Sequence, residues 1–256
     1  MVRKIPDVNE IMRIQDKYSL KKIKCLSGST IKLIALITMI IDHIGSVILR
    51  KVPKALVPIF SVMSHRVSVY VIFRLIGRIA FPLYCFLLVE GFTHTRSKKK
   101  YGINLLVFAL ISEIPWNLKS NGTLLYESQN VFFTLLIGFL GMCFYEKYSE
   151  HKIEQFAALF ALLVFSALFK ADYGYRGYCL IMLMYILRDK KVLQALLGSC
   201  MVSLPFAVIF AFVPINMYSG ERGFIKGNVM KYAFYAAYPI HIIILYIIRV
   251  KYIGYT

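Results

Sequence analysis

The sequence predicts an all-α integral membrane protein, a single bundle of about eight transmembrane helices. Of its residues, 59% are hydrophobic and 17% are charged, and the mean hydropathy is +0.64. A soluble domain is about half apolar and about one-quarter charged. Apolar stretches of about 17–25 residues, long enough to cross a bilayer, recur along the whole chain. These stretches are too long for transmembrane β-strands and lack their two-residue alternation, so helices are the expected spans.

The apolar runs divide the chain into two unequal parts. Residues 1–30 are polar and basic and form a cytoplasmic N-terminal segment, whereas residues 31–256 form the transmembrane domain. No small-residue cleavage site follows the first apolar run, which is therefore expected to stay in the membrane. The predicted spans are roughly 31–49, 69–92, 101–118, 129–147, 153–170, 174–188, 192–215 and 230–250.

The basic residues set the expected orientation. Most of the 31 Lys and Arg residues fall in the N-terminal segment and in alternate loops. Cytoplasmic loops carry an excess of Lys and Arg, so the N-terminus is predicted to be cytoplasmic, and an even number of spans returns the C-terminus to the same side. The net charge of +18 is then a topology signal in a membrane protein, and nucleic-acid binding is not expected. The five cysteines show no metal-ligand spacing and no disulfide framework.

Several ionisable residues lie within the predicted spans, where they are costly and are functional candidates. Counted at about 1.5 Å per residue, they come from five helices and occupy a common layer in the outer half of the bilayer. They are Asp42, His43, Arg74, Arg78, Glu113, Asp172, Arg176 and His241. A common layer of this kind predicts a buried polar site.

A second polar cluster is expected at the cytoplasmic end of the second span. Its members are Glu90, His94, Arg96, Lys98, Lys99 and Lys100. A basic loop in this place is either a topology determinant or a binding site for an anionic ligand.

Three members of the outer layer allow more than one interpretation. Adjacent residues on a helix point about 100° apart, so Asp42 is expected to pair with Arg78 or Arg74 rather than with His43. Arg78 is accordingly either a structural counter-ion or a functional cation. His241, which follows Tyr238 and a proline, is either a helix-kink partner or a functional group.

Six strings carry a resemblance to a known family. They are, in order, IKLIALITMIIDHIGSVIL, RLIGRIAFPLYCFLLVEGFTHTRSKKKY, NLLVFALISEIPWNL, NVFFTLLIGFL, DYGYRGY and KYAFYAAYPIHIIILY. Their polar letters are unusual for membrane helices, and together they cover roughly residues 30–250. In these features the chain resembles the TraX family of membrane proteins.

The resemblance implies an activity. The founding TraX protein is associated with N-terminal acetylation of a conjugative pilin subunit. The family is similar to a wider group of multi-spanning acyltransferases that use a cytoplasmic acyl donor and an intramembrane histidine. The family's motif falls here on Asp42, His43, Gly77, Arg78, Pro82, Glu90, Gly91, His94, Ser112, Pro115, Asn130, Thr134, Asp172, Tyr173, Gly174, Tyr238, Pro239 and His241. An acetyltransferase that uses acetyl-CoA, without a metal, is therefore expected.

Roles for these residues follow as a hypothesis. His43 is the expected general base and Arg78 the stabiliser of the oxyanion, whereas Asp42 is expected to hold Arg78 or to orient the site. The donor is expected to bind at Glu90, His94, Arg96, Lys98 and Lys99. The acceptor, a peptide amine, a lipid-linked sugar or an exported glycan, is expected at Glu113, Asp172, Tyr173, Tyr238 and His241.

Two other classes of protein account for the same polar layer. A proton-coupled transporter or channel uses buried Asp, His and Arg side chains as a relay, and it would show flux without chemistry. A structural component of a secretion or conjugation assembly would tolerate replacement of His43 and Arg78.

Overall fold

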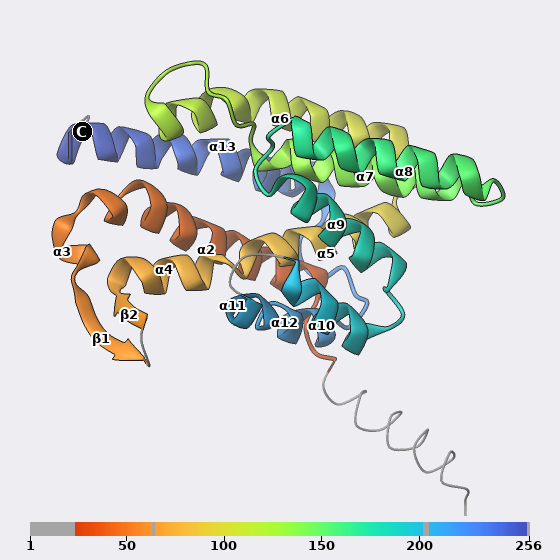
Figure 1. Cartoon of the computed structure of the whole chain (residues 1–256), viewed down its shortest axis with the longest axis horizontal. Helices are drawn as coiled ribbons and strands as arrows, with labels where there is room; N and C mark the ends of the chain where they lie inside the picture. The colour runs from red at the N-terminus through yellow and green to blue at the C-terminus, as the bar shows by residue number, and fades with distance from the viewer. Residues whose placement is uncertain (1–23, 63–64, 202–204, 255–256) are drawn as a thin grey trace, which may run out of the picture.

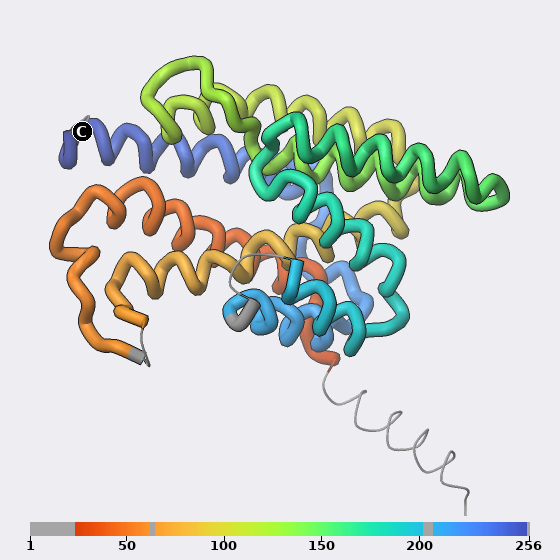
Figure 2. Tube along the Cα trace, viewed as in Figure 1, coloured from red at the N-terminus to blue at the C-terminus, as the bar shows by residue number. Residues whose placement is uncertain are grey.

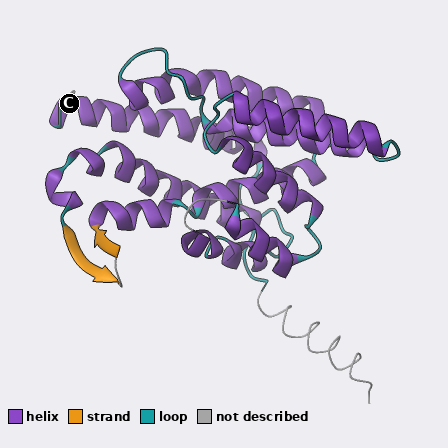
Figure 3. Cartoon of the chain, viewed as in Figure 1, coloured by secondary structure: helices purple, strands orange, loops and turns teal. Residues whose placement is uncertain are grey.

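The computed structural model describes residues 24–62, 65–201 and 205–254, so most of the predicted N-terminal segment lies outside the described residues. Of the described residues, 74% are helical. Figure 3 shows that helices dominate the structure. The helices are α2 (Gly28–Val47), η1 (Leu49–Lys51), α3 (Pro53–Leu56), α4 (Val69–Gly77), α5 (Ala80–His94), α6 (Lys98–Asn121), α7 (Val131–Lys147), α8 (Lys152–Leu168), α9 (Gly174–Ile186), α10 (Lys191–Cys200), α11 (Pro205–Ile209), α12 (Phe212–Asn216) and α13 (Gly227–Tyr252). Strands β1 (Pro58–Val62) and β2 (His65–Ser68) form an antiparallel hairpin between α3 and α4, which the sequence did not predict (Figure 1).

Among the described residues, four helical segments are long and apolar enough to cross a membrane. They are Gly28–Lys51, Val69–His94, Lys98–Asn121 and Gly227–Tyr252. The helices α7 and α8 have 17 residues each and α9 has 13, so they are shorter than the usual span of about 20 residues. A helical membrane protein is thus confirmed, whereas eight full spans are not.

The helices α2, α6 and α13 run in the same direction. At the start of α2, the Leu26 N–H donates to the Met217 carbonyl (2.9 Å) and the Gly28 N–H to the Glu221 carbonyl (2.8 Å), just before α13 begins. At the far end, Arg249 of α13 donates to the carbonyl of Lys119 in the last turn of α6 (2.8 Å). We call the end where α2 begins the amino end of the bundle and the end where α13 finishes the carboxyl end (Figure 2).

A shared side for both termini is not confirmed: among the described residues, the chain starts with α2 at the amino end and finishes with α13 at the carboxyl end. The cause is the predicted span 192–215, which turns back instead of crossing. Lys191, at the start of α10, interacts electrostatically with Lys24 and Glu90 at the amino end, and Met217, just after α12, is bonded to Leu26 at the same end. A hydropathy average cannot distinguish an apolar hairpin from an apolar span.

Proline and glycine explain this reversal. Pro205 opens α11 and Pro214 lies in α12, and a proline lacks the N–H that a continuing helix needs. The helix α10 packs against α12 at Gly198, where an added Cβ would lie 2.5 Å from the Phe212 ring. The reversal also moves Arg222 and Lys226 to the amino end.

The predicted second span is interrupted. The helix α4 ends at Gly77 and α5 begins at Ala80, with Arg78 and Ile79 between them. Pro82 stands in the first turn of α5, where its ring would clash with the carbonyl of Arg78 in one continuous helix. The break places Arg78 on a two-residue turn between α4 and α5.

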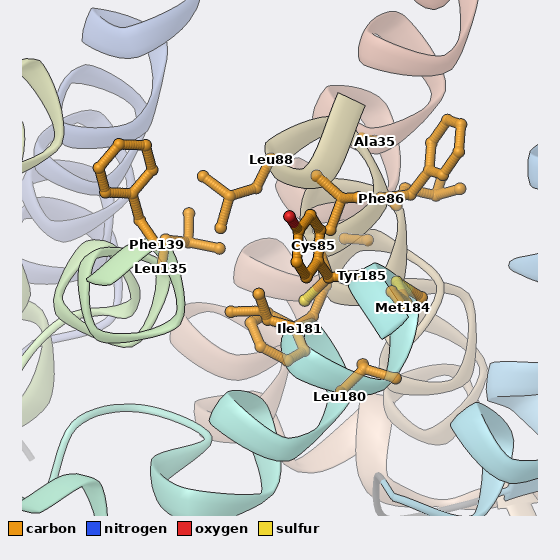
Figure 4. Close-up of a cluster of buried hydrophobic side chains, with 14 of the residues drawn as sticks. Ala35, Cys85, Phe86, Leu88, Leu135, Phe139, Leu180, Ile181, Met184 and Tyr185 are labelled. Carbon is orange, nitrogen blue, oxygen red and sulfur yellow. The ribbon is translucent and has the colours of Figure 1, made fainter. Parts of the chain in front are cut away.

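The apolar core lies around α5, as Figure 4 shows. Cys85 and Leu88 of α5 face Leu135 of α7 and Ile181 of α9, and all four side chains are buried. The helices α7 and α9 approach closely at Gly138, where an added Cβ would lie 2.4 Å from the Ile181 side chain. Small residues at helix crossings are typical of membrane bundles, in which dispersion contacts replace the hydrophobic effect.

Candidate functional site

Two histidines meet inside the bundle. His43 lies one turn before the end of α2, and His241 lies midway along α13. His43 Nδ1 is 2.5 Å from His241 Nε2, and the two rings stack with centroids 4.8 Å apart. Each residue is 8% exposed. The sequence predicted both residues in one layer but not their direct contact.

The hydrogen-bond partners assign the protons of this pair. His241 Nδ1 lies 2.6 Å from the Ala237 carbonyl oxygen, which can only accept, so this nitrogen carries a proton. In neutral His241, Nε2 then accepts the hydrogen bond from Nδ1–H of His43. His43 Nε2 is left with a free lone pair, which is the form that a general base or a nucleophile requires.

Tyr238 forms the third side of the histidine site. Its ring meets His43 edge-on with centroids 5.9 Å apart, and it meets His241 at 5.8 Å. The residue is 4% exposed. His241 thus contacts the backbone of its own helix at Ala237 and the side chain of His43 on α2.

Asp42 points away from His43, as the angle between adjacent helical residues predicts. Its Oδ2 accepts from Arg74 Nη1 at 2.6 Å, so its direct partner is Arg74 rather than Arg78. Gly77 makes this approach possible, because an added Cβ there would lie 2.1 Å from Asp42 Oδ1. The hypothesis that Asp42 holds Arg78 is wrong as a direct contact.

Arg78 stands apart from this ion pair. Its Nε is buried and has no hydrogen-bond partner among the described residues. Its charge interacts with Asp42 and Asp172 at longer range. Arg74 is thus the direct partner of Asp42, and Arg78 adds a second positive charge beside the two carboxylates.

Asp172 and Tyr173 reach the site from the link between α8 and α9. The Thr134 hydroxyl donates to the Asp172 carbonyl, and the Asp172 N–H donates to the Gln129 carbonyl at 2.8 Å. Tyr173 has a φ of 66° and stacks on Phe81 with centroids 3.7 Å apart. This link is therefore held rigidly beside the first turn of α5.

Lys119 belongs to the site although the sequence placed it in an outer loop. The helix α6 continues to Asn121, and Lys119 interacts electrostatically with Asp42, Asp172 and His43. Its Nζ lies 3.8 Å from the centre of the Trp116 ring. Trp116 and Lys119 are three residues apart and therefore lie on one helix face, and this spacing could have placed Lys119 on the helix from the sequence alone.

Glu113 contacts the site indirectly. Its Oε2 accepts from Asn130 Nδ2 at 2.6 Å, and the same amide group donates to the Ala109 carbonyl at 2.8 Å. Asn130 also caps α7 through its side-chain oxygen. Glu113 interacts electrostatically with Tyr238, so it joins α6 and α7 behind the histidine site.

The predicted donor cluster lies at the amino end, away from the histidines. His94 Nδ1 turns back onto the Glu90 carbonyl at 2.9 Å, and Lys98 forms an ion pair with Glu146. Tyr218 donates to Glu90, and burial with that carboxylate raises the pKa of Tyr218 to about 12. Arg96 and Lys99 are exposed.

The two regions are separated by most of α2. His43 follows Gly28 by 15 residues, which corresponds to about 22 Å along the helix. Within the described part of the chain, no group of three His, Cys, Asp or Glu side chains is arranged to hold a metal ion.

Helices able to cross a membrane, together with a buried layer of histidines and ion pairs, define a polytopic membrane protein with an internal polar site. The chain belongs to the TraX protein family, whose model matches residues 27–249. It is also 27% identical over 248 residues to the probable fimbrial assembly protein FimC, serogroup H1, of Dichelobacter nodosus. That match covers 86% of this chain and 94% of the relative. No solved structure matches the chain.

Proposed function

We propose that the protein is a membrane-embedded acyltransferase that transfers an acetyl group from acetyl-CoA to an amine or hydroxyl, with His43 as the general base. The observation that carries this proposal is the chain from the Ala237 carbonyl through His241 to His43. It leaves one imidazole nitrogen, His43 Nε2, unprotonated in a dry site. A neutral imidazole can take a proton from an attacking group and return it to a leaving group, which suits acyl transfer.

The reaction needs one proton acceptor and one stabiliser of negative charge. His43 Nε2 takes the proton of the acceptor amine or hydroxyl as that group attacks the thioester carbonyl. Arg78 stabilises the oxyanion of the tetrahedral intermediate. The carbon–sulfur bond then breaks, and the proton on His43 passes to the leaving thiolate. An acyl-histidine intermediate would use the same nitrogen as the nucleophile.

Charge supports a cytoplasmic amino end. Lys24, Arg222 and Lys226 lie there with the basic residues around Lys98, so the excess of positive charge favours this end as the inner one. The acyl donor would enter from the cytoplasm, and the acceptor would reach the histidines from the carboxyl end. Because the relative is named as a fimbrial assembly protein, the terminal amine of a membrane-held fimbrial subunit is the first acceptor to test.

The test is transfer of labelled acetyl groups from acetyl-CoA to membrane fractions or fimbrial subunits by the purified protein in nanodiscs. His43→Gln should reduce transfer by about 100-fold or more, the usual contribution of a general base. His65→Gln, which changes an exposed histidine of β2, is the matched control and should be unchanged. Full activity of the His43 variant would remove this residue from the mechanism.

A proton-coupled transporter is the second candidate, and the broken helices favour it. The link at Arg78 and the reversing segment from α10 to α12 resemble the interrupted helices on which transporters build their sites. The measurement that separates the two functions is proton flux into liposomes. Flux that is abolished in His43→Gln, with no acetyl transfer to any acceptor, would favour the transporter.

A further inference from the structure

Four cations gather at the amino end, where α2 and α13 begin. Lys32 interacts electrostatically with Arg222 and Lys231, and Lys231 also interacts with Lys100. They come from α2, the segment before α13, α13 itself and α6. Only Lys100 belonged to the basic loop that the sequence singled out. We call these four residues the basic cluster.

The fold holds Arg222 in place through its backbone. The buried Ser29 hydroxyl donates to the Arg222 carbonyl at 2.8 Å and accepts from the Ile225 N–H at 2.7 Å. Between them, Gly223 has a φ of 82°, and an added Cβ there would lie 2.3 Å from Ser27 Oγ. The segment is thus clamped onto the first turn of α2, and Lys32 follows one turn later.

The charges of the basic cluster are not compensated. Among the residues that the structure describes, none of the four makes an ion pair within 4.0 Å, whereas nearby Lys98 is paired with Glu146. Glu221 is exposed beside Arg222 and offsets at most one charge. Lys32 and Lys231 are half-buried, where an uncompensated charge is costlier than in water. A ligand with several negative charges would relieve this repulsion.

The basic cluster lies at nearly the same distance from the histidine site along α2 and along α13. Lys32 precedes His43 by 11 residues on α2, and Lys231 precedes His241 by 10 residues on α13. The two helices are parallel, so the separations correspond to about 15–17 Å along the bundle. A ligand with phosphates at one end and a reactive group on a long flexible arm matches this spacing.

We infer that the basic cluster binds the phosphate groups of the acyl donor, and that the donor's arm extends along α2 and α13 toward His43. This inference rests on the proposed function and relocates the donor site from Lys98 and Lys99 to Lys32, Arg222 and Lys231. The same chemistry would hold the phosphate of an anionic lipid headgroup. The cytoplasmic donor is favoured because two members of the cluster, Lys32 and Lys231, lie on the two helices that carry the histidines.

The experiment is calorimetric titration of CoA into the full-length protein in zwitterionic nanodiscs. The double variant Lys32→Gln/Lys231→Gln should raise the dissociation constant for CoA at least tenfold. Inorganic pyrophosphate should compete with CoA on the unchanged protein but not on the variant. The matched control, Lys54→Gln/Lys251→Gln, removes the same charge from exposed residues at the carboxyl end and should bind CoA normally.

Unchanged affinity for CoA in the double variant would overturn the inference. A second outcome would also overturn it. If the double variant binds CoA normally but no longer binds phosphatidylglycerol in doped nanodiscs, the cluster is a lipid site. If the double variant does not fold, Arg222→Gln, which changes an exposed side chain, gives the same test, and Arg222→Lys should restore binding. CoA binding that depends on the cluster, with no acetyl transfer by the protein, would refute the proposed function and leave this site standing.

Discussion

His43 Nδ1 donates a hydrogen bond to His241 Nε2 although 198 positions separate the two residues in the chain. The contact exists because α2 and α13 run parallel, and the turn before α13 is bonded to the start of α2. His241 thereby decides which nitrogen of His43 is free.

His241 should act as a positioning residue in transfer. His241→Phe removes the acceptor for His43 Nδ1–H, so kcat should fall by about 100-fold while KM for acetyl-CoA stays unchanged. His241→Asn keeps an acceptor oxygen and should recover part of the rate. A parallel loss of rate and of CoA binding would mean that the histidine is needed only for folding.

The ion pair between Asp42 and Arg74 should stabilise the bundle. Asp42→Asn or Arg74→Gln alone should reduce the free energy of unfolding by about 2 kcal/mol, since the pair is only partly exposed. The double variant should lose less than the sum of the single variants. Additive losses in a double-mutant cycle, measured by denaturant unfolding in detergent, would show that the two charges are not coupled.

Gly77 should tolerate no side chain. Gly77→Ala forces a methyl group into the Asp42 carboxylate, so it should lower the unfolding temperature and weaken the contact of α2 with α4. Gly28→Ala is the matched control, because an added Cβ there meets its nearest atoms at an ordinary 3.5 Å. Equal unfolding temperatures for the two variants would contradict the close approach of Asp42 to Gly77.

The two ends of the described chain should label from opposite sides of the membrane. In a cysteine-free background, Lys24→Cys and Lys226→Cys should react with an impermeant thiol reagent from one side, and Lys251→Cys from the other. All three positions are exposed. Labelling of Lys24→Cys together with Lys251→Cys, with Lys226→Cys reacting only from the other side, would mean that the segment 192–215 crosses the membrane after all.

Lys119 should contribute to the site through its charge. Lys119→Met should reduce transfer by about tenfold or more, because it removes a cation that interacts with Asp42, Asp172 and His43. Lys170→Met, at an exposed lysine paired only with exposed Glu127, should have no effect. An unchanged rate in the Lys119 variant would restrict its role to the stability of α6.

The one-dimensional sequence determined the features that depend on composition and local spacing. Hydropathy predicted the helical membrane class, the polar letters inside the spans selected Asp42, His43 and His241, and the angle between neighbours predicted that Asp42 turns away from His43. These properties follow from local helix geometry and from the cost of burying charge, so no tertiary information is needed.

The tertiary structure decided which helices are parallel and therefore which polar groups meet. An apolar run with Gly198, Pro205 and Pro214 has the hydropathy of a span, yet packing of α10 on α12 turns it back and reverses the direction of α13. That single reversal brings His241 to His43, Arg222 to Lys32, and the last turn of α13 to the carboxyl end of the bundle. A hydropathy average cannot detect long-range packing of this kind. The same apolar residue types cover the inside of a helical hairpin and the lipid-facing surface of a span.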